Sequence, residues 1–237
     1  MWSALSRGLV LGGLLAVGPA ANPAATLEVA PVVHELPPGR NALSMSVANR
    51  GSAAATVQVR CFVWSQVDGQ DRLVPADGVL LSPAVFTIGV GATQTVRALF
   101  ADDRAPQERT YRLLVDEIPR SDDGERVRFA LRLSVPVFMA ATGQQAAALN
   151  WKVEAGTQTL TAVNQGGARQ RVREIELRRH GGERLRATNA AGPYLLAGAV
   201  RGWSLAGAAA TLRPGEPVTL SAQTDAGPVE VSLVVAP

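Results

Sequence analysis

The sequence predicts an all-β protein built from two β-sandwich domains. Short segments with alternating apolar and polar residues, the pattern of half-buried strands, follow one another along the chain. Residues that favour turns are frequent, with 23 Gly and 15 Pro among 237 residues, whereas aromatic residues make up only 5%. The spacing of about fourteen short strands with intervening turns, and no convincing helical segment, is typical of two sandwiches.

Residues 1–25 are expected to form a cleaved secretory signal peptide. Arg7 supplies a short positive region, an apolar run follows from 8 to 17, and small residues occupy 18–25. The apolar run is too short to span a bilayer as a helix. The sequence therefore predicts an exported protein that is not stably inserted in a membrane.

The first half of the chain reads as a series of strands separated by polar turns. Pro37-Pro38-Gly39 and Asp68-Gly69 are typical turn sequences. Strands are expected at residues 27–29, 32–33, 43–48, 57–64, 86–88, 95–100 and 111–115.

The most regular segment runs from Val127 to Phe138. Apolar side chains occupy every second position, and Pro136 lies between two of them. Because proline has no N–H to donate, Pro136 indicates an edge position at that end of the strand. The pattern alone favours an ordinary core strand, because most alternating strands face a core.

A low-complexity stretch, residues 141–148, is expected to link the two domains. The N-terminal domain would then cover 26–140 and a smaller C-terminal domain 149–237. Asn49-Arg50-Gly51 in the first half has a counterpart in Asn164-Gln165-Gly166, a weak internal repeat. Strands of the second half are expected at 160–163, 172–177, 210–212, 218–222 and 230–235.

The composition argues against several classes of function. The net charge is +3, but the arginines are scattered among acidic residues, which indicates a solvated surface and no nucleic-acid partner. Cys61, His34 and His180 are the only Cys and His residues, so neither a nucleophilic site nor a metal centre is expected. We expect no enzymatic activity and no cofactor. The tryptophans Trp64, Trp151 and Trp203 are expected to serve packing.

Three segments together resemble a known family. They are the string from Tyr111 to Pro119 (YRLLVDEIP), the alternating strand 127–138, and Gly192 to Leu196 (GPYLL). They are similar to periplasmic pilus-assembly chaperones of the chaperone–usher pathway, in particular the archaic, spore-coat-U-associated branch. The resemblance extends from about Leu27 to the end of the chain. It implies two immunoglobulin-like domains in an L or boomerang arrangement, located in the periplasm.

The resemblance also implies a mechanism and two partners. A pilus subunit lacks the last strand of its fold, and the chaperone lends an edge strand to it before delivery to an outer-membrane usher. The implied donor strand is 127–138. An open edge would also allow a second copy of the chain to bind as a self-capping dimer. The side chains implied to fill the groove of the subunit are Val127, Phe129, Leu131, Leu133 and Val135.

The sequence departs from the family at the anchor for the subunit's C-terminal carboxylate. The family uses an Arg near the first strand and a Lys in the donor strand, but those positions hold Val33 and Pro136 here. Arginine is the natural replacement because it binds carboxylates with two parallel hydrogen bonds. Arg112 is the first candidate and Arg97 the second, and a simple surface role for both remains open at this stage.

Another class of function also fits the two sandwiches. The chain would then be a secreted two-domain adhesive or structural surface protein, which would need a segment for attachment. An enzyme on a β-sandwich is disfavoured by the small number of His and Cys residues.

Overall fold

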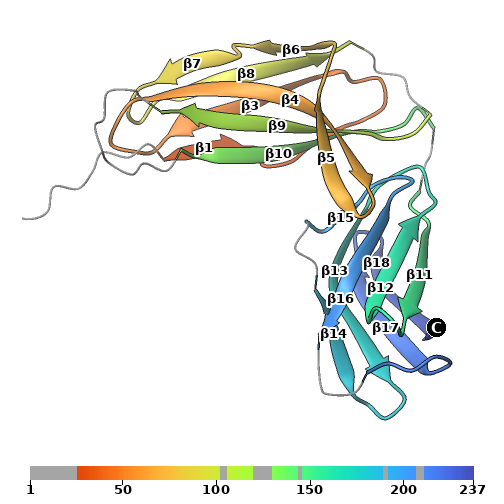
Figure 1. Cartoon of the computed structure of the whole chain (residues 1–237). Coiled ribbons are helices and arrows are strands. Elements are labelled where there is room, and N and C mark those ends of the chain that lie inside the picture. The colour runs from red at the N-terminus through yellow and green to blue at the C-terminus, as the bar shows by residue number, and fades with distance from the viewer. Residues whose placement is uncertain (1–25, 102–105, 120–129, 144–145, 189–191, 207–210) are drawn as a thin grey trace, which may run out of the picture.

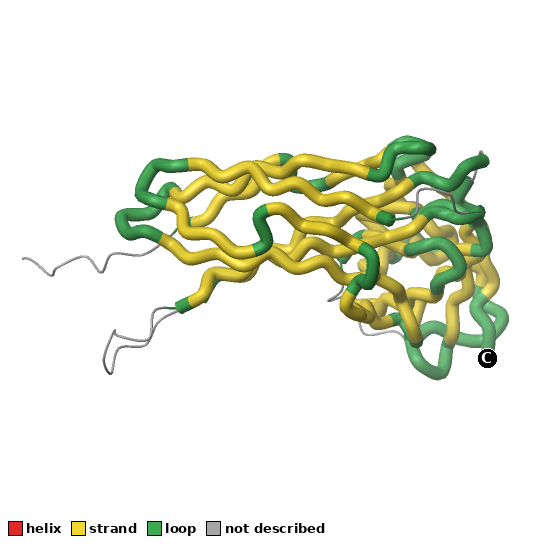
Figure 2. Tube along the Cα trace, turned by 90° about the horizontal axis from the view of Figure 1, so that it is seen from above, coloured by secondary structure: helices red, strands yellow, loops and turns green. Residues whose placement is uncertain are grey.

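The computed structural model describes residues 26–101, 106–119, 130–143, 146–188, 192–206 and 211–237. Within this described part the eighteen regular elements are all strands (Figure 2). It contains no helix of the length and hydropathy needed to cross a membrane. The strands form two domains arranged as an L (Figure 1). The predicted two-domain all-β fold is confirmed.

Two sheets form the sandwich of the N-terminal domain. The first has the order β1-β3-β8-β6, and the second the order β2-β10-β9-β4-β5, with β7 also paired to β4. The first sheet consists of β1 (Leu27–Ala30), β3 (Ala42–Asn49), β6 (Val79–Ser82) and β8 (Thr93–Phe100). The second consists of β2 (His34–Leu36), β4 (Ala55–Val67), β5 (Gln70–Pro75), β7 (Val85–Ile88), β9 (Arg109–Ile118) and β10 (Arg132–Met139).

The core of this sandwich follows the period-two alternation of its strands. In β4, for example, Val57, Val59 and Cys61 point inward and are buried, while the residues between them are partly exposed. Burial raises the pKa of the Cys61 thiol to about 12. The thiol is therefore protonated at neutral pH and acts as a small apolar side chain.

The C-terminal domain is one continuous curled sheet. Its order is β11-β12-β16-β14-β13-β17-β18, and β15 pairs with β13. Glu154 of β11 forms a parallel bridge with Ala236, two residues after the end of β18, and this bridge nearly closes the sheet on itself. Its strands are β11 (Leu149–Glu154), β12 (Thr159–Asn164), β13 (Gln170–Arg179), β14 (Arg184–Thr188), β15 (Tyr194–Leu195), β16 (Val200–Ala206), β17 (Pro217–Thr224) and β18 (Gly227–Val234).

The weak sequence repeat corresponds to a repeated turn. Asn49 and Asn164 each end a strand, and both are fully buried. Each side-chain amide donates to the carbonyl four residues later, at 2.7 Å for Ala53 and 2.8 Å for Ala168. Each side-chain oxygen also accepts the N–H two residues later. The asparagine side chain thus supplies hydrogen bonds to backbone groups that have no neighbouring strand where the chain turns.

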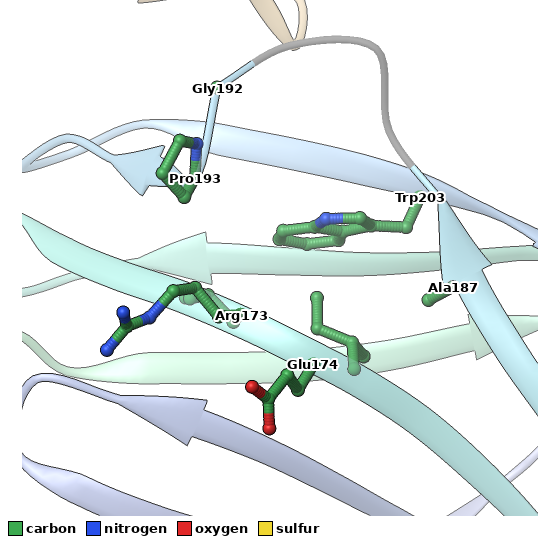
Figure 3. Close-up of a pocket in the computed structure, with 8 residues that line it drawn as sticks. Arg173, Glu174, Ala187, Gly192, Pro193 and Trp203 are labelled. Atoms are coloured by element: carbon green, nitrogen blue, oxygen red, sulfur yellow. The ribbon is translucent and has the colours of Figure 1, made fainter.

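Strand β13 is not the regular strand that the sequence predicts. The register against β17 shifts between Arg173 and Glu176, and Glu174 has a φ of 52°. This β-bulge lets Val172 and Ile175 both face the core although they are three residues apart. Arg173 and Glu174 line a hollow of about 310 Å³ at the bulge, and none of the predicted site residues line it. Figure 3 shows the side chains of both residues on the same strand.

Two short expected strands also differ from the structure. Residues 31–33 form a bend, and the strand begins one residue later, at His34. Residues 211–213 have no regular structure. Leu212 is nevertheless only 2% exposed, because it packs into the domain core and its N–H donates to Gln158 Oε1 at 3.0 Å. The apolar character of Leu212 therefore predicts its burial correctly, but residues 211–213 do not form the expected strand.

Candidate functional site

Strand β10 has an open edge along most of its length. One edge pairs with β9 over all eight residues, from Arg132 to Met139. The other edge pairs with β2 only at residues 137–139. Among the described residues, no strand pairs with this second edge from Arg132 to Pro136. The segment 132–136, here called the open edge, can therefore accept a strand from another chain.

Within the described part of the chain, the backbone groups of the open edge that point away from β9 pair with no other strand, and they follow a fixed pattern. Glu117 N–H donates to the Leu131 carbonyl at 2.9 Å, so residue 131 directs its backbone groups toward β9. In an antiparallel pair this direction alternates, so Arg132 and Ser134 direct theirs away from β9. Pro136 also faces outward, where its missing N–H costs no bond within the sheet. This supports the edge position that Pro136 predicts.

The five predicted groove-filling residues have different environments. Val127 and Phe129 lie outside the described residues. Leu131 and Leu133 are half-buried and pack at the margin of the domain core. Val135 is only 1% exposed and belongs to the core of its own domain. Within the described strand, Leu131 and Leu133 are thus the apolar side chains that a partner can reach.

An ion-pair network fixes the start of the open edge. Asp116 in β9 accepts hydrogen bonds from Arg60 in β4, with Nη2 at 2.7 Å, and from Arg132 in β10. Burial acts to raise the pKa of Asp116, but the hydrogen bonds from the two arginines outweigh it and lower the pKa. Asp116 therefore stays ionised and connects three adjacent strands. This connection ties β10 to its neighbours at the point where the described residues provide no strand on its outer edge.

The strand that covers the other end of β10 carries a buried histidine. His34 in β2 is 8% exposed, and its Nε2 has no hydrogen-bond partner. Burial lowers the pKa of His34 below its ordinary value of 6.5. Folding therefore favours the neutral imidazole over the charged form, because burial penalises the charge and Nε2 has no acceptor to compensate it.

We expect the free energy of unfolding to fall as the pH decreases below about 6.5. His34 binds its proton less tightly when folded, so its contribution is complete above the unfolded-state pKa. It is lost as the pH falls toward the folded-state pKa, by at most about 1.4 kcal/mol per pH unit. Urea unfolding at several pH values should show a smaller slope for His34→Gln than for the wild type. The exposed His180→Gln is the control, and an unchanged slope in His34→Gln would contradict this account.

Arg112 lies beside the end of the open edge. It is the cross-strand partner of Pro136 in the β9–β10 register. Its guanidinium lies 3.8 Å from the centre of the Trp64 ring, a cation–π contact. Burial lowers the pKa of Arg112, while Asp71 acts in the opposite direction. A guanidinium keeps its proton far above neutral pH, so Arg112 remains a cation despite its burial. The structure thus places Arg112 next to Pro136, the position at which the resemblance to pilus-assembly chaperones implies a lysine.

Arg97 lies in a different part of the N-terminal domain. It belongs to β8 in the first sheet, where its register partners are Ser44 and Ser82. Its side chain is exposed and borders a hollow of about 680 Å³, together with Leu80 and Leu99. Arg97 and Arg112 are therefore in opposite sheets of the sandwich, and the structure does not bring them together.

Three aromatic rings form the junction between the domains. Trp64 and Phe138 belong to the N-terminal domain, and Tyr194 of β15 packs on both, with ring centres 5.9 and 5.1 Å away. The guanidinium carbon of Arg169 lies 3.6 Å from the centre of the Phe138 ring. The same guanidinium forms ion pairs with Glu108 and Glu35. The expected packing role of Trp64 is confirmed here, since its side chain is 2% exposed.

The hairpin formed by β4 and β5 makes a second contact with the C-terminal domain. The Gln66 side chain donates to the Tyr194 carbonyl at 2.9 Å and accepts the Leu196 N–H at 3.0 Å. Asp71 binds Nη2 of Arg201 at 2.8 Å, and the Arg201 side chain is only 1% exposed. Sequence reasoning missed this contact. The apolar residues around Arg201 in the sequence indicate that it could be buried, but they do not identify Asp71, 130 residues away, as its partner.

Comparison with known proteins finds one family model that matches the first half of the chain and a group of solved structures with a similar fold. The family model described as "Pili and flagellar-assembly chaperone, PapD N-terminal domain" matches residues 27–143. A comparison with curated proteins finds no match.

The solved structures with similar folds cover nearly the whole chain. One is a chain of the CsuC–CsuE chaperone–tip adhesion subunit complex from archaic Csu pili of Acinetobacter baumannii, with a TM-score of 0.62 and 19% identity, covering 90% of this chain and 99% of that one. A second comes from the SafA pilin–SafB chaperone complex of Salmonella enterica, with a TM-score of 0.62 and 15% identity, covering 90% of this chain and 99% of that one. A third is the E. coli chaperone DraB, with a TM-score of 0.59 and 16% identity, covering 88% of this chain and 99% of that one.

Proposed function

Because the N-terminal domain of this chain belongs to the family of pilus and flagellar-assembly chaperones, we propose that the protein binds, folds and caps pilus subunits in the periplasm. It donates an edge strand to each subunit and delivers it to an outer-membrane usher. It acts by binding and performs no catalysis. Residues 1–25 direct its export as a signal peptide.

The observation that carries the proposal is the open edge beside two half-buried leucines. A strand of the subunit pairs with the free backbone groups of Arg132 and Ser134. Leu131 and Leu133 then extend the apolar face of β10 into the groove of the subunit. We propose that Val127 and Phe129 continue this face on the N-terminal side. Val135 contributes from within the core of the N-terminal domain.

The end of the open edge also determines where the subunit strand stops. Val137 to Met139 are already paired with β2, so a strand that binds the open edge ends near Pro136. Arg112 is the cross-strand neighbour of Pro136. A strand that ends there with its chain terminus presents a carboxylate to this guanidinium. This placement favours Arg112 over Arg97 as the anchor.

Co-expression in the periplasm tests the proposed function. The tagged mature chain is expressed with the pilin-like subunits encoded beside its gene, and the complexes are purified and analysed by size and composition. A soluble complex of one chaperone with one subunit is expected, and the subunit should aggregate without the chaperone. If the subunits are equally soluble alone, strand donation is wrong and the surface-adhesin alternative gains support.

We expect Arg112→Gln to weaken binding of the subunit by about 10- to 100-fold. One hydrogen bond to a charged group contributes about 1.5–3 kcal/mol, and about 1.4 kcal/mol corresponds to a factor of ten. Titration of purified chaperone with refolding subunit measures the change. Arg97→Gln is the matched control and should bind as the wild type does. Equal effects of the two substitutions would remove Arg112 from the anchor role.

A further inference from the structure

Arg112 has a counterpart on the other side of the domain junction. Arg171 of β13 is the register partner of Tyr194, and its guanidinium lies 5.6 Å from the centre of the Tyr194 ring. Arg112 lies over Trp64. The Trp64 and Tyr194 rings are themselves in edge contact. One arginine from each domain thus packs on one pair of touching rings.

These two arginines differ from the other arginines at the junction in their charge balance. Arg169 is neutralised by Glu108 and Glu35, and Arg201 by Asp71. Among the described residues, neither Arg112 nor Arg171 has a carboxylate within ion-pair distance, and Nε of Arg171 is buried without a hydrogen-bond partner. Both side chains are half-buried, so each remains accessible from solvent.

This arrangement favours an anion. Half-buried positive charges without an ion-pair contact are costly because they lose part of their hydration. Asp71, the carboxylate whose charge acts on Arg112, is already paired with Arg201. Each guanidinium offers a planar set of N–H donors that matches a carboxylate. The open edge ends at Pro136, next to Arg112, so the anion that a bound strand brings to this place is the carboxylate of its own C-terminus.

We infer that Arg171 of the C-terminal domain is a second ligand of the partner's C-terminal carboxylate, together with Arg112 of the N-terminal domain. The inference rests on the proposed function and adds a residue to its site. A bound partner then connects both domains, because its terminal carboxylate is held from each side of the junction. Binding of the terminus and the relative orientation of the domains become linked.

A double comparison tests this inference. The subunit is prepared by semisynthesis with either a free C-terminal carboxylate or a C-terminal amide, and its affinity is measured for the wild type and for Arg171→Gln. We expect Arg171→Gln to weaken binding of the carboxylate form about tenfold and to leave binding of the amide form unchanged. Arg186→Gln, an exposed arginine on β14 of the same domain, is the control and should not discriminate between the two forms.

The possible results separate the inference from the function on which it rests. An equal loss of affinity for carboxylate and amide forms would show that Arg171 only stabilises the junction, and an unchanged affinity for both would also overturn the inference. In both cases the wild type still forms the complex, so the proposed function stands. If the wild type binds neither form, the proposed function itself fails and Arg171 loses its role with it.

Discussion

Leu131→Glu is expected to abolish the stable complex with the subunit. Leu131 is half-buried at the margin of the N-terminal core, directly before the open edge. In the proposed complex this side chain lies in the apolar groove of the subunit. A carboxylate without a partner in such a site costs several kcal/mol. About 3 kcal/mol corresponds to a loss of roughly 100-fold in affinity, enough to lose the complex during purification.

The measurement is the recovery of subunit with the tagged chaperone from the periplasm. Thr95→Glu is the matched control, because it places the same charge on an exposed site of β8, a strand paired on both edges. Urea unfolding of each free chaperone verifies that both variants are folded. Recovery of the subunit with Leu131→Glu at the wild-type level would rule out strand donation through this face of β10.

Much of the fold is readable from local patterns in the sequence. The period-two alternation predicts the strand that becomes β10, and Pro136 indicates an edge position near its C-terminal end. Among the described residues, the outer edge of β10 is open from 132 to 136. The repeated Asn-x-Gly predicts two related turns, because Asn49 and Asn164 use the same side-chain hydrogen bonds. The bulge in β13 also left a signal, since the buried residues Val172 and Ile175 are three positions apart.

The site is only partly readable in the same way. Arg112 was the first candidate for the anchor, and the register with Pro136 supports it. Arg171 gave no comparable signal, because its importance depends on Tyr194 from another strand and Trp64 from the other domain. The cover of β10 by β2 is equally hidden, since three residues carry too little pattern. Contacts between single residues far apart in sequence leave no periodicity to detect.

The contact between Asp71 and Arg201 shows what such a hidden pair does. Arg201 is almost completely buried, and its charge is compensated by Asp71 and by the Gly192 carbonyl. Burial lowers the pKa of Arg201, and Asp71 acts to raise it. The pair crosses from the β4–β5 hairpin to the C-terminal domain, next to Gln66, which binds Asp71 at 3.0 Å. The interaction therefore joins the stability of the C-terminal domain to its position on the N-terminal one.

Asp71→Ala is accordingly expected to lower the free energy of unfolding by about 3 kcal/mol. Removing one partner of a buried ion pair leaves an uncompensated charge, which costs about 3–5 kcal/mol. The lower end applies because the Asp71 side chain is 32% exposed, so water can partly replace it.

Asp77→Ala, in an exposed turn of the same domain, is the control and should change stability by less than about 0.5 kcal/mol. Urea unfolding followed by tryptophan fluorescence measures both, since Trp64 and Trp203 report on the two domains. If Asp71→Ala is as stable as the control, water rather than Asp71 compensates Arg201, and the Asp71–Arg201 pair does not contribute to holding the two domains together.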